Sequence, residues 1–186
     1  MKKLLVLLSA LLLIFAVGCS NDKPAPDGGT MPEIPDSAPQ EYTPVPEEQR
    51  AEFVSTALGF FSAIFQENDV QELLRSDEGG SNEECTLSVS VSQTDDIGTV
   101  DFHFDGFVLS ALAQQIGKNV TLWGGYSTSG PVGEGSDMSG NAFSFNVVVS
   151  ITDIGNYHLS GSFTPTQQTF VIYLNDDPVE ISNQPQ

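Results

Sequence analysis

The strongest constraint on the fold is an alternation of apolar and polar residues with a period of two. From Cys85 to Val91 every second residue is apolar, and the residues between them are Thr or Ser. The same pattern returns at 100–105, where Val, Phe and Phe alternate with Asp101, His103 and Asp105. A strand with one buried and one solvated face requires this spacing, because successive side chains point to opposite faces.

Further strands are expected along the rest of the chain. The same reasoning predicts them at 120–127, 142–152, 157–164 and 169–175. Their close spacing and short polar turns leave no room for crossover helices, so the strands should form an antiparallel meander.

A helical period precedes the strands. Apolar residues recur every three or four positions in this segment, at Phe53, Ala57, Phe60, Phe61, Ile64 and Phe65. This spacing predicts an amphipathic helix after Glu47, and a second short helical turn is expected near 69–74. The predicted fold class is therefore α+β, with an N-terminal amphipathic helix packed on an antiparallel meander that curves into a half-barrel.

Two local assignments depend on glycine. Asp105-Gly106 is typical of a two-residue hairpin turn, because that turn needs positive φ. The following run, 107–112, has the composition of a strand or of a short helix that ends at Gly117. We favour the strand.

Several strands are apolar on both sides. Trp123, Val148, Val171 and Tyr173 all leave the main apolar stripe of their strands. A second apolar set needs a cover, such as a loop or a ligand, unless these are scattered exposed residues of no consequence. Trp123, Tyr126, Val171 and Tyr173 are the candidate ligand or partner surface.

The N-terminal residues have the pattern expected of a secretory signal. Lys2 and Lys3 precede fourteen residues, Leu4–Val17, that are apolar except for Ser9. A membrane-spanning helix needs ~20 apolar residues, whereas the core of a signal peptide needs ~7 to 15. Ala16-Val17-Gly18-Cys19 then resembles the lipobox of bacterial lipoprotein precursors.

The resemblance implies that Cys19 is lipidated and becomes the first residue of the mature chain. Two or three acyl chains would attach the protein stably to a membrane surface outside the cytoplasm. Ser20 after the cysteine is similar to the pattern sorted to the outer membrane in Gram-negative bacteria. The resemblance therefore predicts residues 1–18 as a signal peptide.

Residues 19–47 follow as an acylated, proline-rich tether, and 48–186 as a single domain. The segment 20–47 holds seven of the eleven prolines and shows no apolar period. Such a composition favours an extended spacer at ~3 Å per residue, which allows a reach of about 80 Å.

The charge excludes one large class of partner. The chain has 25 acidic and six basic residues, a formal net charge of −19. Without Lys2 and Lys3, four basic residues remain and the net charge is −21. A protein that binds nucleic acid through phosphates needs clustered Lys and Arg, so no nucleic-acid partner is expected.

Few residues suggest chemistry. Asp101, His103 and Asp105 share one strand face and have the chemistry to hold zinc or to orient a general base, although a solvated polar face is the simpler interpretation. Two acidic stretches, at 134–141 and 175–180, contain calcium-type oxygen ligands without the spacing of a calcium loop. Cys85 lies in phase with the apolar residues and is expected to be buried. No cofactor is expected.

Three functions remain after these steps. The first is a lipid-anchored, extracytoplasmic lipoprotein whose domain is a non-catalytic binding or envelope-structural module, with an envelope protein or an apolar molecule as partner. The second is a carrier that encloses a lipid or a small apolar ligand. The third is a metal-assisted hydrolase centred on His103.

Overall fold

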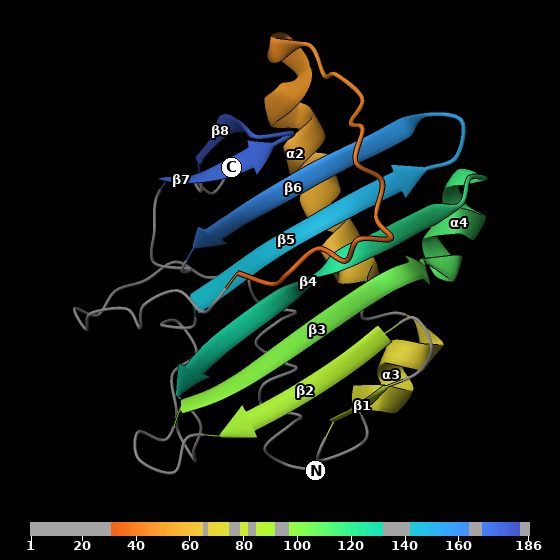
Figure 1. Cartoon of the computed structure of the whole chain (residues 1–186). Coiled ribbons are helices and arrows are strands. Elements are labelled where there is room, and N and C mark those ends of the chain that lie inside the picture. Colours follow the sequence, from red (N-terminus) through yellow and green to blue (C-terminus); the bar gives the residue numbers. More distant parts are fainter. Residues whose placement is uncertain are drawn as a thin grey trace.

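The computed structural model describes residues 31–64, 67–74, 79–81, 85–91, 97–131, 142–163 and 169–182. Its centre is an antiparallel sheet whose strands follow the order of the chain, and each strand pairs with the next (Figure 1). The strands are β1 (Gly79–Ser81), β2 (Cys85–Val91), β3 (Ile97–Val108), β4 (Val120–Pro131), β5 (Ala142–Ile151), β6 (Gly155–Phe163), β7 (Thr169–Leu174) and β8 (Asp177–Ser182). The predicted antiparallel meander is thus confirmed. The sheet is open, because β1 and β8 stand at opposite ends of the order.

Three helices accompany the sheet in the described part of the chain: α2 (Glu47–Ile64), α3 (Asn68–Leu74) and α4 (Ser110–Ile116). Helix α2 crosses behind the sheet in the view of Figure 1. Its Val54, Ala57 and Ile64 are buried in the core, and the Phe53 ring lies 4.5 Å from the ring of Tyr157 on β6. Phe65 and the side chains of Phe60 and Phe61 lie outside what the structure describes. None of the described helices is long and apolar enough to cross a membrane.

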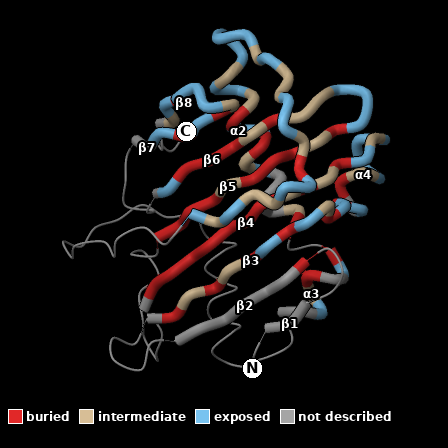
Figure 2. The backbone as a smooth tube through the Cα atoms, in the orientation of Figure 1, coloured by how far each residue is buried: buried red, intermediate tan, exposed pale blue. Residues whose placement is uncertain are grey.

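The core lies between α2 and the face of the sheet that carries Phe102, Tyr126, Phe145 and Leu159, here called the inner face. Aromatic rings follow one another across it. Phe104 contacts Phe107 at 5.5 Å between ring centroids, and Phe102 contacts Tyr126 at 6.4 Å. Figure 2 shows the buried residues concentrated along the central strands. In β3 the buried Val100, Phe102 and Phe104 alternate with half-buried and exposed residues, as the two-residue period predicts, whereas β5 is buried on both faces over most of its length.

The Asp105-Gly106 pair is not a hairpin turn, and that prediction was wrong. Strand β3 continues through it to Val108, and the pairing with β4 shifts register between Asp105 and Phe107. Gly106 has φ of 76° and therefore supplies the positive φ of a bulge. A bulge and a tight turn use the same glycine conformation, so the dipeptide alone does not separate them.

The segment 107–112 divides between the two expected structures. Residues 107 and 108 end β3, and the strand assignment is wrong for Ser110–Ile116, which form α4. Gly117 ends this helix with φ of 68°, and its N–H donates to the carbonyl of Ala113. A left-handed glycine just after the last turn is a common helix stop.

The acidic stretch at 175–180 is a hairpin. Leu174 pairs with Asp177, and the two residues between them, Asn175 and Asp176, have φ of 50° and 68°. A tight two-residue hairpin turn needs positive φ at both of its central residues, and Asn and Asp tolerate this conformation. The sequence analysis did not predict strand β8, whose Pro178 and Glu180 interrupt the usual strand composition.

The proline-rich segment lies on the other face of the sheet, the outer face, which carries Trp123, Asn146 and His158. Residues 31–46, here called the strap, run across the front of the sheet in Figure 1 before entering α2. The strap hydrogen-bonds to β5, β6 and the β7–β8 turn. The second half of the segment that we expected to be a tether therefore packs on the outer face of the domain (Figure 1).

Candidate functional site

The four residues of the predicted partner surface do not form one surface. Trp123 lies on the outer face of β4, because it pairs with Asp105 and Val148 and alternates with the buried Leu122. Tyr126 lies on the inner face with 7% of its surface exposed. Val171 and Tyr173 lie on β7, and their exposed fractions are 38% and 44%. Strands β5 and β6 separate them from Trp123 on β4.

The predicted metal candidates share one face of β3, as their spacing requires. Asp101 accepts a hydrogen bond from Ser127 of β4, Asp105 accepts one from Ser37 of the strap, and His103 is exposed. Across the described ranges no group of three or more His, Cys, Asp and Glu side chains is placed to hold a metal ion. The arrangement is that of polar residues on a sheet surface with local partners.

Two further predictions concern single positions. Cys85 is buried in the core with 1% exposure, as its place in the alternation predicts. Cys19 and the acidic stretch at 134–141 lie outside the described residues.

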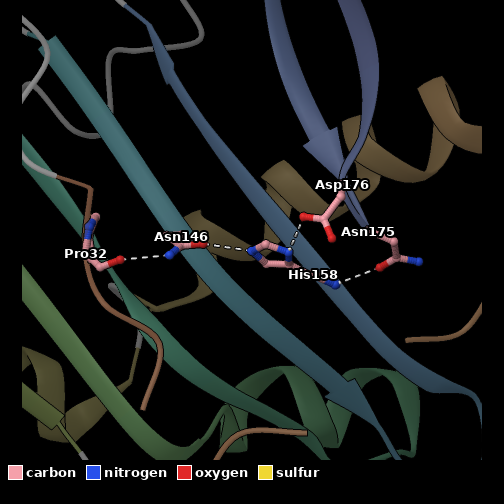
Figure 3. Close-up of polar contacts among 5 residues, drawn as sticks. All are labelled: Pro32, Asn146, His158, Asn175 and Asp176. Carbon is pink, nitrogen blue, oxygen red and sulfur yellow. Dashed lines mark hydrogen bonds and ion pairs between the residues drawn. The ribbon is translucent and has the colours of Figure 1, made fainter. Parts of the chain in front are cut away.

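A polar network that the sequence analysis missed lies on the outer face, centred on His158 of β6 (Figure 3). Its Nε2 lies 2.8 Å from Oδ1 of Asn146 on β5, and its Nδ1 lies 3.4 Å from Oδ1 of Asp176 in the β7–β8 turn. The backbone N–H of His158 donates to Oδ1 of Asn175 at 2.9 Å. Three elements distant in sequence therefore meet at one residue.

The strap fixes the tautomer of His158. Nδ2 of Asn146 donates to the carbonyl oxygen of Pro32 at 2.8 Å, and a carbonyl can only accept. The amide oxygen of Asn146 must then face His158, so Nε2 of the imidazole carries the hydrogen. In the neutral ring this leaves the lone pair of Nδ1 toward the carboxylate of Asp176.

Three asparagine side chains bind three carbonyl groups of the strap. Besides Asn146 on Pro32, Asn156 donates to the carbonyl of Glu41 at 3.3 Å and Asn175 donates to that of Thr43 at 2.8 Å. Thr43 also exchanges bonds with Asn156, because its N–H donates to the Asn156 carbonyl at 2.7 Å and its Oγ1 accepts from the Asn156 N–H at 3.2 Å. The sheet thus recognises the backbone of the strap.

Two glycines make room for the strap. A Cβ added at Gly125 would lie 2.6 Å from Cβ of Pro32, and one added at Gly155 would lie 2.7 Å from Cβ of Thr43. Real side chains do not approach so closely, so larger residues at these positions would displace the strap or the backbone. Gly125 also approaches the Phe102 carbonyl, which makes it necessary to the sheet itself.

Burial and charge act in opposite directions on His158. Burial lowers the pKa of its imidazole below the ordinary 6.5, while the neighbouring Asp176 carboxylate raises it. Burial is the larger effect, because Asp176 is 82% exposed and its field is screened by water. The Tyr42 ring of the strap lies 5.4 Å from the imidazole, and burial and Asp176 both raise the pKa of Tyr42.

Sequence signals for this network were weak. Asn146, Asn156 and His158 occupy outward positions of strands, where polar residues also occur simply because water faces them. The hydrogen bond between Asn146 and Pro32 spans 114 positions, beyond the reach of any local pattern. The one available hint was the second apolar set, which required a cover.

Comparison with known proteins adds no relative: no family model, no curated protein and no solved structure matches the chain.

Proposed function

We propose that the chain is a lipid-anchored, extracytoplasmic lipoprotein whose α+β domain is a non-catalytic binding or envelope-structural module. The observation that carries this proposal is the sequence around Cys19, where a charged start, an apolar core of signal-peptide length and a small residue before the cysteine coincide. Acylation at Cys19 would attach the domain to the membrane surface.

The position of the strap supports an anchored domain. The first strap residue that hydrogen-bonds to the sheet is Pro32, thirteen positions after Cys19. A spacer of thirteen residues would reach about 40 Å at ~3 Å per residue. A docked strap would therefore keep Pro32 within about 40 Å of the acylated residue.

The charge supports acyl chains as the means of attachment. After removal of the signal, the net charge of −21 gives electrostatic repulsion from anionic lipid headgroups. Protein surface alone would give little affinity for such a membrane, whereas two or three acyl chains give stable attachment.

The use of the polar groups favours a non-catalytic role. Both ring nitrogens of His158 face structural partners, Asn146 and Asp176, and its backbone N–H is bound by Asn175. Asp101 and Asp105 likewise have hydroxyl partners in Ser127 and Ser37. A general base needs a ring nitrogen within reach of a substrate proton, and the strap covers the side of the sheet where a substrate would approach His158.

The alternative of a lipid carrier would require space against the inner face. In the described residues, this face is occupied by the chain's own aromatic side chains, including Phe102, Phe143 and Phe145, each 1% exposed. The binding module is therefore the better proposal.

Metabolic labelling tests the anchor. Bacteria that express the full precursor are grown with labelled palmitate, and three forms are compared: the natural chain, Cys19→Ser and Cys85→Ala. We expect label in the natural chain and in Cys85→Ala, and none in Cys19→Ser. Label that persists in Cys19→Ser, or that never enters the natural chain, would overturn the proposal.

Native mass spectrometry then separates the modes of binding. The acylated protein in detergent should show the mass of the chain and its acyl groups. A further, stoichiometric lipid of reproducible mass would favour the carrier instead.

A further inference from the structure

The strap is held mainly by polar contacts. It contains no helix or strand between residues 31 and 46, and of its described side chains only Ala38 is buried. Its contacts with the sheet are mainly hydrogen bonds, three of them to strap carbonyls and others through Ser37 and Thr43, and the Tyr42 ring contacts His158. The one apolar residue of the strap that packs against the core is Val45, which is partly buried. A segment with little apolar burial and several polar bonds has low local stability, so it can detach while the core stays folded.

We propose that the strap is a releasable latch: its docking or release sets the length of chain between the acylated Cys19 and the domain. His158 is the central residue of the network that holds the strap. The inference rests on the proposed acylation of Cys19 for its consequence at the membrane, but the release itself is a property of the domain.

Docking and release change the reach of the anchor about twofold. With the strap docked, thirteen positions separate Cys19 from Pro32, and a spacer of that length would reach about 40 Å at ~3 Å per residue. With the strap released, the free chain extends to Glu47, where α2 begins, and the reach is about 80 Å. Release would also free the side-chain amides of Asn146, Asn156 and Asn175, which donate to strap carbonyls in the docked state.

His158 joins the two ends of the strap. Through Asn146 it is linked to Pro32 at the beginning of the strap, and through Asn175 it is linked to Thr43 near the end. A change in the position of His158 would therefore weaken the attachment of the strap at both Pro32 and Thr43. Networks of this kind act as units because each group orients the next.

Protonation should favour release. The groups that face His158 are Asp176 from the turn, Tyr42 from the strap and Asn146 from β5. Because burial lowers the pKa of His158, the docked strap disfavours the imidazolium, and release would return the ring to water. Binding of a proton and detachment of the strap are then linked, and Asp176 partly opposes this effect.

Hydrogen exchange of the Thr43 amide tests the latch on the purified full chain, because this N–H donates to the Asn156 carbonyl only while the strap is docked. Asn175→Asp is the informative variant. Aspartate tolerates the left-handed conformation and keeps the oxygen that accepts from His158, but it replaces the donor to Thr43 by a carboxylate oxygen. We expect the protection of the Thr43 amide to fall about tenfold, which corresponds to one net hydrogen bond.

A matched control is Asp153→Asn, which removes the charge partner of Lys118 at another turn residue with positive φ. It should leave the protection of Thr43 unchanged. If Thr43 exchanges as slowly as the amides of central β5 in every form, the strap opens only with global unfolding and the latch is refuted.

The dependence on pH gives a second readout. Between pH 7.5 and pH 5.5, the protection of Thr43 relative to central β5 amides should fall in the natural chain and stay constant in His158→Gln, whose amide nitrogen can still donate to Asn146. If the protection of Thr43 changes with pH to the same extent in both forms, His158 does not link protonation to release of the strap.

The consequence at the membrane is measured separately, by energy transfer between labelled lipid headgroups and a dye on the domain of vesicle-bound protein. Asn175→Asp should shift the distances outward relative to Asp153→Asn. If acylation fails, no vesicle-bound protein is obtained while the exchange results stand. If the latch fails, bound protein shows equal distances for both variants.

Discussion

Asn146 and His158 hold each other in a single orientation on the outer face, with Nε2 of the imidazole donating to the amide oxygen at 2.8 Å. The orientation of the amide is set by the carbonyl of Pro32, which only a donor can face. A strap residue thus decides where the hydrogen of a histidine on β6 resides. The geometry leaves Nδ1 toward Asp176, and this relationship can be tested by titration.

Asp176→Asn should lower the pKa of His158. The carboxylate of Asp176 raises that pKa, and an amide removes the charge while keeping the left-handed turn conformation that Asn tolerates. The pKa is measured from the chemical shift of the His158 imidazole Hε1 as a function of pH. An unchanged or raised pKa of His158 would show that Asp176 does not act on the ring.

Stability should fall as the pH drops below about 6.5, because His158 has a lowered pKa in the folded chain. In that window the unfolded chain binds a proton at this histidine and the folded chain does not, so the free energy of unfolding decreases. The decrease stops once the folded form is protonated as well. Urea unfolding followed by Trp123 fluorescence at pH 7.5 and pH 5.5 measures it.

His158→Gln provides the comparison for this pH effect. The variant should lose less stability over the same interval than the natural chain, because glutamine does not titrate. The prediction is contradicted if the free energy of unfolding changes with pH to the same extent in the natural chain and in His158→Gln.

The same substitution should have opposite effects at two glycines. Gly106→Ala should lower the free energy of unfolding by about 1 to 2 kcal/mol, since an L residue at φ of 76° is strained even though the nearest atom is 3.7 Å from the new Cβ. Gly59→Ala, inside α2 and with open space around the new Cβ, should raise it by about 1 kcal/mol. Chemical denaturation of the two variants tests this, and effects of equal sign would be inconsistent with the bulge geometry.

The strands were predictable because their signal is local. Phe102 and Phe104 follow the two-residue period that burial of one face imposes, and the structure buries both. A helix ending at Gly117 was one of the two alternatives for the segment after residue 107, but the strand was favoured, and the structure forms the helix. Local patterns do not separate two structures that need the same backbone conformation. At Gly106 a bulge and a hairpin turn both need positive φ, so the sequence did not decide between them.

The site was not predictable for a different reason. Asn146, Asn175 and His158 meet only after β5, β6 and the β7–β8 turn are assembled, and their partner is a proline-rich segment more than a hundred positions away. The proline-rich composition of residues 31–46 predicted an extended spacer, and an extended segment can also dock on a finished sheet through its backbone carbonyls. Gly155 next to Thr43 shows that the sheet is shaped for this contact.

The packing of α2 on the sheet leads to a last prediction. Phe53 and Tyr157 have ring centroids 4.5 Å apart with planes tilted by 47°, a favourable geometry for aromatic pairs. In a double-mutant cycle with Phe53→Ala and Tyr157→Leu, we expect a coupling free energy of about 0.5 to 1.5 kcal/mol. Phe53→Ala combined with Val171→Ala should be additive, because Val171 lies exposed on the outer face, on the opposite side of the sheet. Urea unfolding gives all the required free energies. Additivity of the Phe53 and Tyr157 changes would mean that α2 is held by its buried aliphatic residues, Val54 and Ile64, and not by this ring contact.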